Sequence, residues 1–214
     1  MLWALHSEED ARLQLKDFDL GRAIVAIVFL ATLALIVLVL LFAGHSDTRN
    51  TASIGGQFNL IDDEGKTVSE ASLLGKPSVV YFGYTYCPDV CPTTLQDIAR
   101  WMKLLGPAAD QMNFVFVTVD PQRDTPRLLH VYLASFDRRI RGLTGKIDEI
   151  ARIAKEYGVY FKRVSGPSGT YSEDHSTRIY LMGENGQFVD TIGYQEPDAS
   201  AMQKIRKLIA LDGR

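Results

Sequence analysis

The sequence contains two cysteines, Cys87 and Cys91, which lie in the stretch GYTYCPDVCP at residues 83–92. Two cysteines placed at random in a chain of this length would lie within four residues of each other only about 4% of the time, and cysteine spacing is informative about function. Two thiols this close form a reversible disulfide or, as thiolates, bind a soft metal ion. The alternative is a pair of inert cysteines that happen to be neighbours.

Two thiolates alone make an incomplete metal site, so a third donor is needed. The chain has four histidines. His6 and His45 flank a long apolar segment, and His130 lies opposite the apolar face of its predicted helix. His175 remains, in the polar stretch YSEDHST at residues 171–177, just before a predicted strand. On the sequence alone, a histidine in a polar loop is more often a simple surface residue.

The segments around the cysteines predict a βαβ unit. Residues 78–84 and 112–119 are nearly continuous apolar runs, typical of buried parallel strands, and apolar residues recur at helical spacing between them. Cys87 and Asp120 follow the two strand ends, so we expect them at one edge of the sheet. Because a proline disfavours helical geometry in the residue before it, Pro92 predicts Cys91 as the helix N-cap. The helix dipole then favours thiolates at this end.

The rest of residues 54–214 predicts further helices and strands of one α/β domain. Thr125-Pro126 predicts a helix start, with that helix running to about Phe136. We also expect a helix over 147–157, strands over 159–164, 178–182 and 188–192, and a terminal helix over 199–211. Asn185-Gly186 predicts a hairpin between the last two strands. A βαβ unit, then helices, then an antiparallel hairpin and a final helix is the order of thioredoxin-like folds.

Residues 23–43 contain no charged side chain. A helix of this length covers the hydrocarbon core of a bilayer, so we predict a single transmembrane anchor rather than a cleaved signal peptide. Three basic residues precede it in residues 1–22, whereas Arg49 alone follows it closely. The positive-inside rule therefore places residues 1–22 in the cytoplasm and the domain across the membrane, after a tether over 44–53. The acidic residues of the N-terminal segment are atypical of a mitochondrial transit peptide, which favours a bacterial inner membrane with the domain in the periplasm.

Composition limits the remaining function classes. The chain has 214 residues, 46% hydrophobic and 23% charged, with a net charge of -3. These values exclude a disordered chain and allow one ordinary globular domain. They give no reason to expect a nucleic-acid partner.

Three separated motifs resemble the SCO/SenC copper proteins of cytochrome c oxidase assembly. They are residues 83–92, VDPQRDTP at 119–126, and DHS at 174–176 leading into Tyr180-Leu181, in matching order over about residues 55–212. The resemblance implies a thioredoxin-like fold in which Cys87, Cys91 and His175 bind copper, with Asp120 at the edge of the site. It also implies three partners, namely a copper-bearing oxidase subunit, an upstream copper donor and a periplasmic thiol reductant.

The donor set agrees with copper. Thiolates select Cu(I) and imidazole suits either Cu(I) or Cu(II), although zinc also accepts these ligands. Asp89 or Asp174 is a candidate to orient His175 by a hydrogen bond. Asp120 and Asp124 have a simpler interpretation, as caps of the turn and of the helix that follows.

Other functions stay open. Cys87 and Cys91 as a redox pair would suit a thiol-disulfide reductase that keeps the cysteines of the oxidase copper site reduced, or a redox sensor. General reductases usually use Cys-x-x-Cys facing a cis-proline loop, whereas three residues separate these cysteines and no proline lies between Pro167 and Pro197. A thiol peroxidase needs only one reactive cysteine and gives His175 no role.

Overall fold

A computed structural model describes residues 25–38 and 54–212, in two compact units that divide between Thr51 and Ala52. Residues 25–38 are helical and exposed along their whole length. Of the predicted segments, 1–22 and 44–53 lie outside the described residues, as do both ends of 23–43. Within the described ranges, no helix has the combined length and apolar character that crossing a membrane requires.

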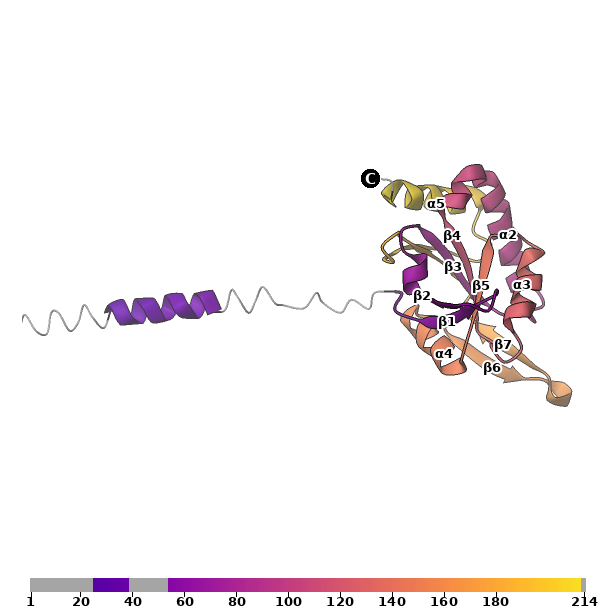
Figure 1. Ribbon diagram of the computed structural model, residues 1–214, viewed down its shortest axis with the longest axis horizontal. Coiled ribbons are helices and arrows are strands. Elements are labelled where there is room, and N and C mark those ends of the chain that lie inside the picture. The colour runs from indigo at the N-terminus through magenta and orange to yellow at the C-terminus, as the bar shows by residue number, and fades with distance from the viewer. Residues whose placement is uncertain (1–24, 39–53, 213–214) are drawn as a thin grey trace, which may run out of the picture. The chain divides into compact units, whose positions relative to one another are not determined.

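The second unit is built on a seven-stranded sheet with the strand order β2-β1-β5-β4-β3-β8-β9. Its three central strands are parallel, and the outer strands pair antiparallel (Figure 1). The strands are β1 (Asn59–Asp62), β2 (Thr67–Ser69), β3 (Ser78–Gly83), β4 (Asn113–Thr118), β5 (Ile140–Thr144), β8 (Ile179–Met182) and β9 (Phe188–Ile192). This arrangement confirms the predicted thioredoxin-like α/β fold.

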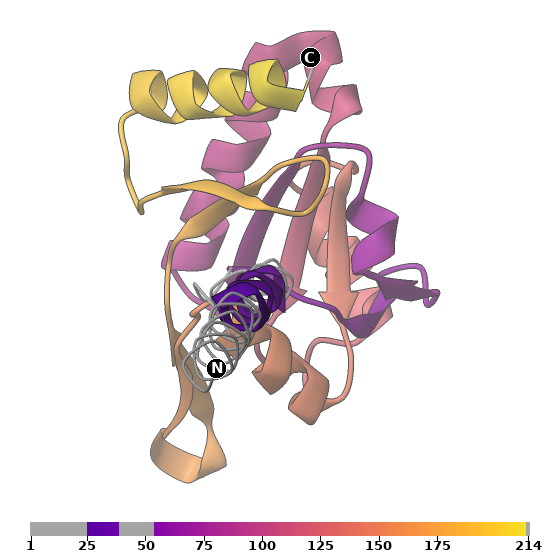
Figure 2. The same cartoon turned by 90° about the vertical axis from the view of Figure 1, so that its left-hand side faces the viewer.

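Helices cover both faces of the sheet. In Figures 1 and 2, α2 (Val90–Leu105) and α3 (Pro126–Ala134) lie on one face and α4 (Ile147–Glu156) on the other. The last helix, α5 (Asp198–Asp212), packs against β8 and β9. Short 3-10 helices occur at η1 (Glu70–Leu73), η2 (Gly106–Gln111) and η3 (Pro167–Gly169). The predicted start of α3 is confirmed, since the Thr125 side chain accepts a hydrogen bond from the Leu128 N–H.

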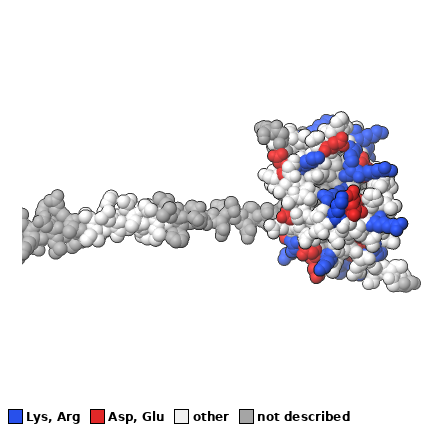
Figure 3. Space-filling model, viewed as in Figure 1, with Lys and Arg blue, Asp and Glu red and all other residues white. Residues whose placement is uncertain are grey.

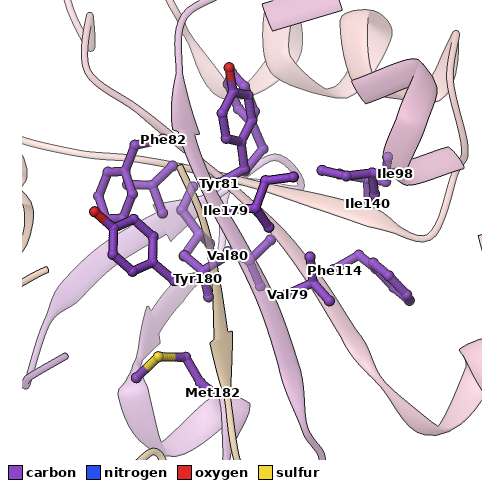
Figure 4. Close-up of a cluster of buried hydrophobic side chains, with 14 of the residues drawn as sticks. Val79, Val80, Tyr81, Phe82, Ile98, Phe114, Ile140, Ile179, Tyr180 and Met182 are labelled. Atoms are coloured by element: carbon purple, nitrogen blue, oxygen red, sulfur yellow. The ribbon is translucent and has the colours of Figure 1, made fainter. Parts of the chain in front are cut away.

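Strand β3 carries the core of the domain. All six of its residues are buried, and it pairs with β4 along its full length. Figure 4 shows Val79, Val80, Tyr81 and Phe82 packed among side chains of neighbouring strands. Because β3 is covered on both faces, the loop that follows it starts from a firmly held point.

A separate hairpin lies beside this sheet. β6 (Phe161–Ser165) and β7 (Tyr171–His175) pair antiparallel with each other and form a two-stranded sheet of their own. In both views the hairpin projects beyond the rest of the domain (Figures 1 and 2). The prediction that His175 lies in a loop is wrong, since it is the last residue of β7. This strand is polar and shows no alternation of apolar residues, so the sequence did not indicate a strand here.

The surface carries charges of both signs. On the face shown in Figure 3, Lys and Arg side chains are intermixed with Asp and Glu side chains rather than gathered into one basic region. This mixture agrees with the small net charge of the sequence.

Candidate metal centre

The cysteine-containing loop connects β3 to α2. Helix α2 begins at Val90 with Asp89 as its N-cap, so Cys91 is the second helical residue and its prediction as the N-cap is wrong. The physical reason lies in the position of Pro92. The first four N–H groups of a helix have no intrahelical acceptor, so a proline at the third position removes no helical hydrogen bond.

The two sulfur atoms meet at the start of this helix. The Cys91 N–H donates to Cys87 Sγ over 3.4 Å, and the Cys87 N–H donates to the Tyr84 carbonyl over 3.3 Å. Cys91 is completely buried beside Gly83, where an added Cβ would lie 2.9 Å from its sulfur. Cys87 is only partly buried. The glycine at 83 is a site residue that the sequence analysis missed, and it makes room for the buried sulfur.

The pKa values of the two cysteines shift in opposite directions because their environments differ. A hydrogen bond with Cys91 is the main cause that lowers the pKa of Cys87 to about 4, with a further contribution from His175, while burial opposes the shift. The same hydrogen bond, together with burial, raises the pKa of Cys91. At neutral pH the metal-free pair therefore holds one thiolate, on Cys87, and one proton, on Cys91.

His175 reaches the sulfurs from β7. Its Nε2 lies 3.4 Å from Cys91 Sγ, and the three potential ligand atoms of Cys87, Cys91 and His175 lie within 4.8 Å of one another. Its Nδ1 lies 2.8 Å from the Ser176 carbonyl oxygen. Because a carbonyl only accepts hydrogen bonds, Nδ1 carries a proton, and Nε2 is the ring nitrogen that faces the sulfurs.

Aromatic rings fix the plane of this imidazole. The Tyr84 and Tyr81 rings meet the His175 ring edge to face, with centroids 5.7 and 6.5 Å away. The other described histidine, His130, is exposed on α3 and contacts Asp63 over 3.0 Å. Two sulfurs and one nitrogen in this arrangement fit copper or zinc by ligand type.

Two buried carboxylates support the loops around the centre. Asp124 accepts hydrogen bonds from the Thr85 N–H, the Thr85 hydroxyl and the Thr118 hydroxyl over 3.0, 2.6 and 2.6 Å. It thereby ties the cysteine loop to β4, a role that the sequence did not reveal, and Thr125 performs the capping instead. Burial raises the pKa of Asp124, against these hydrogen bonds. Asp120 is fully buried and accepts from Arg123 and from the Tyr171 hydroxyl.

The remaining two predicted acids, Asp89 and Asp174, are exposed. The hydrogen bond at Nδ1 of His175 goes to the Ser176 carbonyl rather than to either carboxylate. The structure thus brings together Cys87, Cys91 and His175, and it places Asp120 in a neighbouring hydrogen-bond network.

Comparison with known proteins gives a consistent result. The SCO1/SenC family model matches residues 46–210. The mitochondrial protein SCO2 of Saccharomyces cerevisiae is 40% identical over 162 residues, which are 74% of this chain and 54% of that protein. The chain thus spans about half the length of this relative.

Two solved structures with copper bound are similar to this chain. The structure of ScoI from Bradyrhizobium japonicum is 43% identical with a TM-score of 0.69, covering 73% of this chain and 99% of that one. Yeast Sco1 with copper bound is 39% identical with a TM-score of 0.68, covering 74% of this chain and 89% of that one.

Proposed function

The chain belongs to the SCO1/SenC family, and on that premise we propose that it is a copper chaperone that binds copper through Cys87, Cys91 and His175. One observation carries the proposal: the three ligand atoms lie within 4.8 Å of one another. The copper-bound structures of similar proteins support copper over zinc for this donor set.

The unequal exposure of the ligands suits transfer as well as binding. Cys91 is buried, whereas Cys87 and His175 are partly exposed. Ligands of a partner protein therefore have access to the metal from the side of Cys87 and His175. Three protein ligands also leave coordination positions for an incoming group, which is what a metal exchange between proteins requires.

We further propose that the recipient is the binuclear copper site of cytochrome c oxidase, on its copper-bearing subunit. The family resemblance of the sequence motifs supports this choice of recipient. The scheme needs an upstream copper donor and a thiol reductant, because a Cys87–Cys91 disulfide would remove two of the three ligands.

The proposed location is a bacterial inner membrane, with residues 23–43 as a single anchor and the domain over residues 54–214 in the periplasm. The uncharged stretch and the excess of basic residues before it support this topology. An anchored chaperone would operate close to a membrane-embedded oxidase.

The binding proposal is tested with the full chain purified in detergent and fully reduced. Copper stoichiometry, competition against a Cu(I) chelator and the visible absorption of the Cu(II) form are measured. We expect one copper per chain in the wild type, and weaker copper binding in Cys87→Ser, Cys91→Ser and His175→Ala. His130→Ala is the matched control, since it removes an exposed histidine outside the site. Wild-type binding in all three ligand variants would contradict the proposal.

A second candidate function is thiol-disulfide reduction. The lowered pKa of Cys87 favours it, because the thiolate is the attacking species. Cys87 would attack a target disulfide, and Cys91 would then resolve the mixed disulfide, so that two electrons and two protons pass to the target. This function predicts that His175→Ala retains reductase activity while either serine variant loses it. A redox sensor would show neither copper transfer nor disulfide reduction. Its Cys87–Cys91 pair would still be oxidised or reduced according to the redox potential of its surroundings.

A further inference from the structure

The hairpin that carries His175 depends on contacts outside itself. β6 and β7 pair only with each other, and among the side chains of their strands that the structure describes, only Glu173 is buried. An isolated two-stranded hairpin is at best marginally stable in water. The position of the His175 ring is therefore set by whatever holds this hairpin against the domain.

One strong attachment lies at Tyr171, the first residue of β7. Its hydroxyl donates to Asp120 Oδ1 over 2.9 Å, and its carbonyl accepts from Arg123 Nη1 over 3.1 Å. The Arg123 guanidinium also lies over the Tyr171 ring, 3.7 Å from the centroid. Side chain and backbone of Tyr171 are thus both held by the loop between β4 and α3.

The same guanidinium contacts the cysteine loop. It lies 4.6 Å from the ring centroid of Tyr86, the residue directly before Cys87, and 5.8 Å from that of Tyr84. Its Nε donates to the buried Asp120 carboxylate, which fixes its orientation. One cation therefore bridges the loop that carries Cys87 and the strand that carries His175. A planar guanidinium stacks on rings and donates in several directions at once, which a lysine ammonium does not do.

We propose that Arg123 is a positioning residue that holds the His175 strand against the cysteine loop, so that Nε2 lies close enough to the sulfurs to bind the same metal ion. Arg123 does not ligate the metal; it acts through Tyr86 and Tyr171. The metal readout of this inference rests on the proposed function, whereas its structural readout does not.

The structural test uses the reduced, metal-free full chain. NMR measures the nuclear Overhauser contact between the His175 and Tyr84 rings and the amide hydrogen exchange of β6 and β7. In Arg123→Lys the ring contact is lost and hairpin exchange accelerates by about tenfold or more, because the hairpin opens at lower free energy. Exchange in α2 stays unchanged. Tyr171→Phe, which removes only the hydroxyl bonded to Asp120, gives a smaller acceleration and serves if the arginine variant does not fold.

Arg141→Lys is the matched control. Arg141 forms a comparable pair, with its Nη2 2.8 Å from Oδ2 of the buried Asp62, but it contacts none of the three ligands. It leaves the ring contact and the hairpin exchange at wild-type values. Wild-type values in Arg123→Lys and Tyr171→Phe, or equal changes in Arg141→Lys, overturn the inference.

The metal test follows on loaded protein. In Arg123→Lys the copper affinity falls about 10- to 100-fold, the range for residues that orient a ligand, and the Cu(II) spectrum moves toward that of His175→Ala. An unchanged spectrum and affinity overturn the inference. If wild-type protein binds no copper, the proposed function fails, and the NMR result alone decides the role of Arg123.

Discussion

The cysteine loop and the β6–β7 hairpin supply ligands to the same centre under opposite physical conditions. The loop follows β3, whose residues are all buried, and ends in a helix that buries Cys91 completely. The hairpin is a two-stranded appendage that is mostly exposed to solvent. The sulfurs are therefore fixed by the core, whereas the imidazole is held by a few specific contacts.

Because of this difference, the spacing of the two sulfurs and the placement of the His175 ring are determined independently. Burial and packing set the spacing of the two sulfurs, so the thiol pair persists whenever the domain is folded. The third ligand depends on a segment of low intrinsic stability, and segments of this kind open locally without global unfolding. Binding by the sulfurs and completion of the site by His175 are thus separable events.

The largest effect is expected from the ligands themselves. Cys87→Ser and Cys91→Ser weaken Cu(I) binding by more than about 100-fold, beyond the range seen for outer residues, since thiolates are the ligands that select Cu(I). His175→Ala costs less for Cu(I) than either serine variant and removes the nitrogen signature of the Cu(II) form. Chelator competition and electron paramagnetic resonance measure the two effects. Equal losses of Cu(I) affinity in all three variants would contradict the view that the sulfurs bind the metal independently of the imidazole.

The second expectation concerns thiol reactivity in the metal-free protein. Because the pKa of Cys87 is lowered to about 4, its alkylation rate stays constant from pH 8 to pH 5 and falls only as the pH approaches 4. Cys91, buried and with a raised pKa, reacts on the order of 100-fold more slowly. Mass spectrometry after timed iodoacetamide treatment resolves the two sites.

Removal of His175 shifts this profile in a defined direction. The His175 contact lowers the pKa of Cys87, so His175→Ala moves the midpoint of Cys87 alkylation to higher pH. A wild-type midpoint near the ordinary thiol value of about 8.5 would refute the assigned contacts.

A third expectation tests the close packing around the buried sulfur. In Gly83→Ala the new Cβ meets Cys91 Sγ and Phe116 Cε2, both at 2.9 Å. Overpacking of this kind lowers the free energy of unfolding by about 1 to 3 kcal/mol. Gly193→Ala is the control, since the nearest atom to its added Cβ lies 3.8 Å away. Urea denaturation followed by fluorescence compares the two variants, and equal stability would show that the space beside Cys91 is not limiting.

The same contrast between regions explains what the sequence could predict. Central strands β3 and β4 were identified because buried strands are continuous apolar runs, and the start of α3 because Thr125-Pro126 is a local signal. Strand β7 escaped prediction because its residues are mostly polar and its pairing with β6 is set by contacts rather than by composition. β1, β2 and β5 contain no comparable run of apolar residues.

The residues of the site also fall into two groups, those that the sequence predicts and those that only the folded structure reveals. The two cysteines are predicted from residue type and spacing, since those features belong to the chemistry. His175 is predicted as a ligand only through the resemblance of its motif to the family. Arg123 and Asp124 lie in the motif at residues 119–126, yet their roles depend on partners 39 or more positions away, Thr85 and Tyr171. Gly83 is important because the Cys91 sulfur and the Phe116 ring pack against it in the folded domain. Such roles are properties of the folded state, which local patterns do not contain.

The smallest effect is predicted in the hairpin, and it tests the comparison most directly. Val79 on β3 is 1% exposed and Val164 on β6 is 47% exposed. Val79→Ala removes two buried carbons and leaves a cavity, which lowers the free energy of unfolding by about 2 kcal/mol. Val164→Ala changes it by less than about 0.5 kcal/mol. Urea denaturation of both variants measures the contrast. A cost at Val164 as large as that at Val79 would mean that the hairpin unfolds together with the core, and the imidazole would then be held as firmly as the sulfurs.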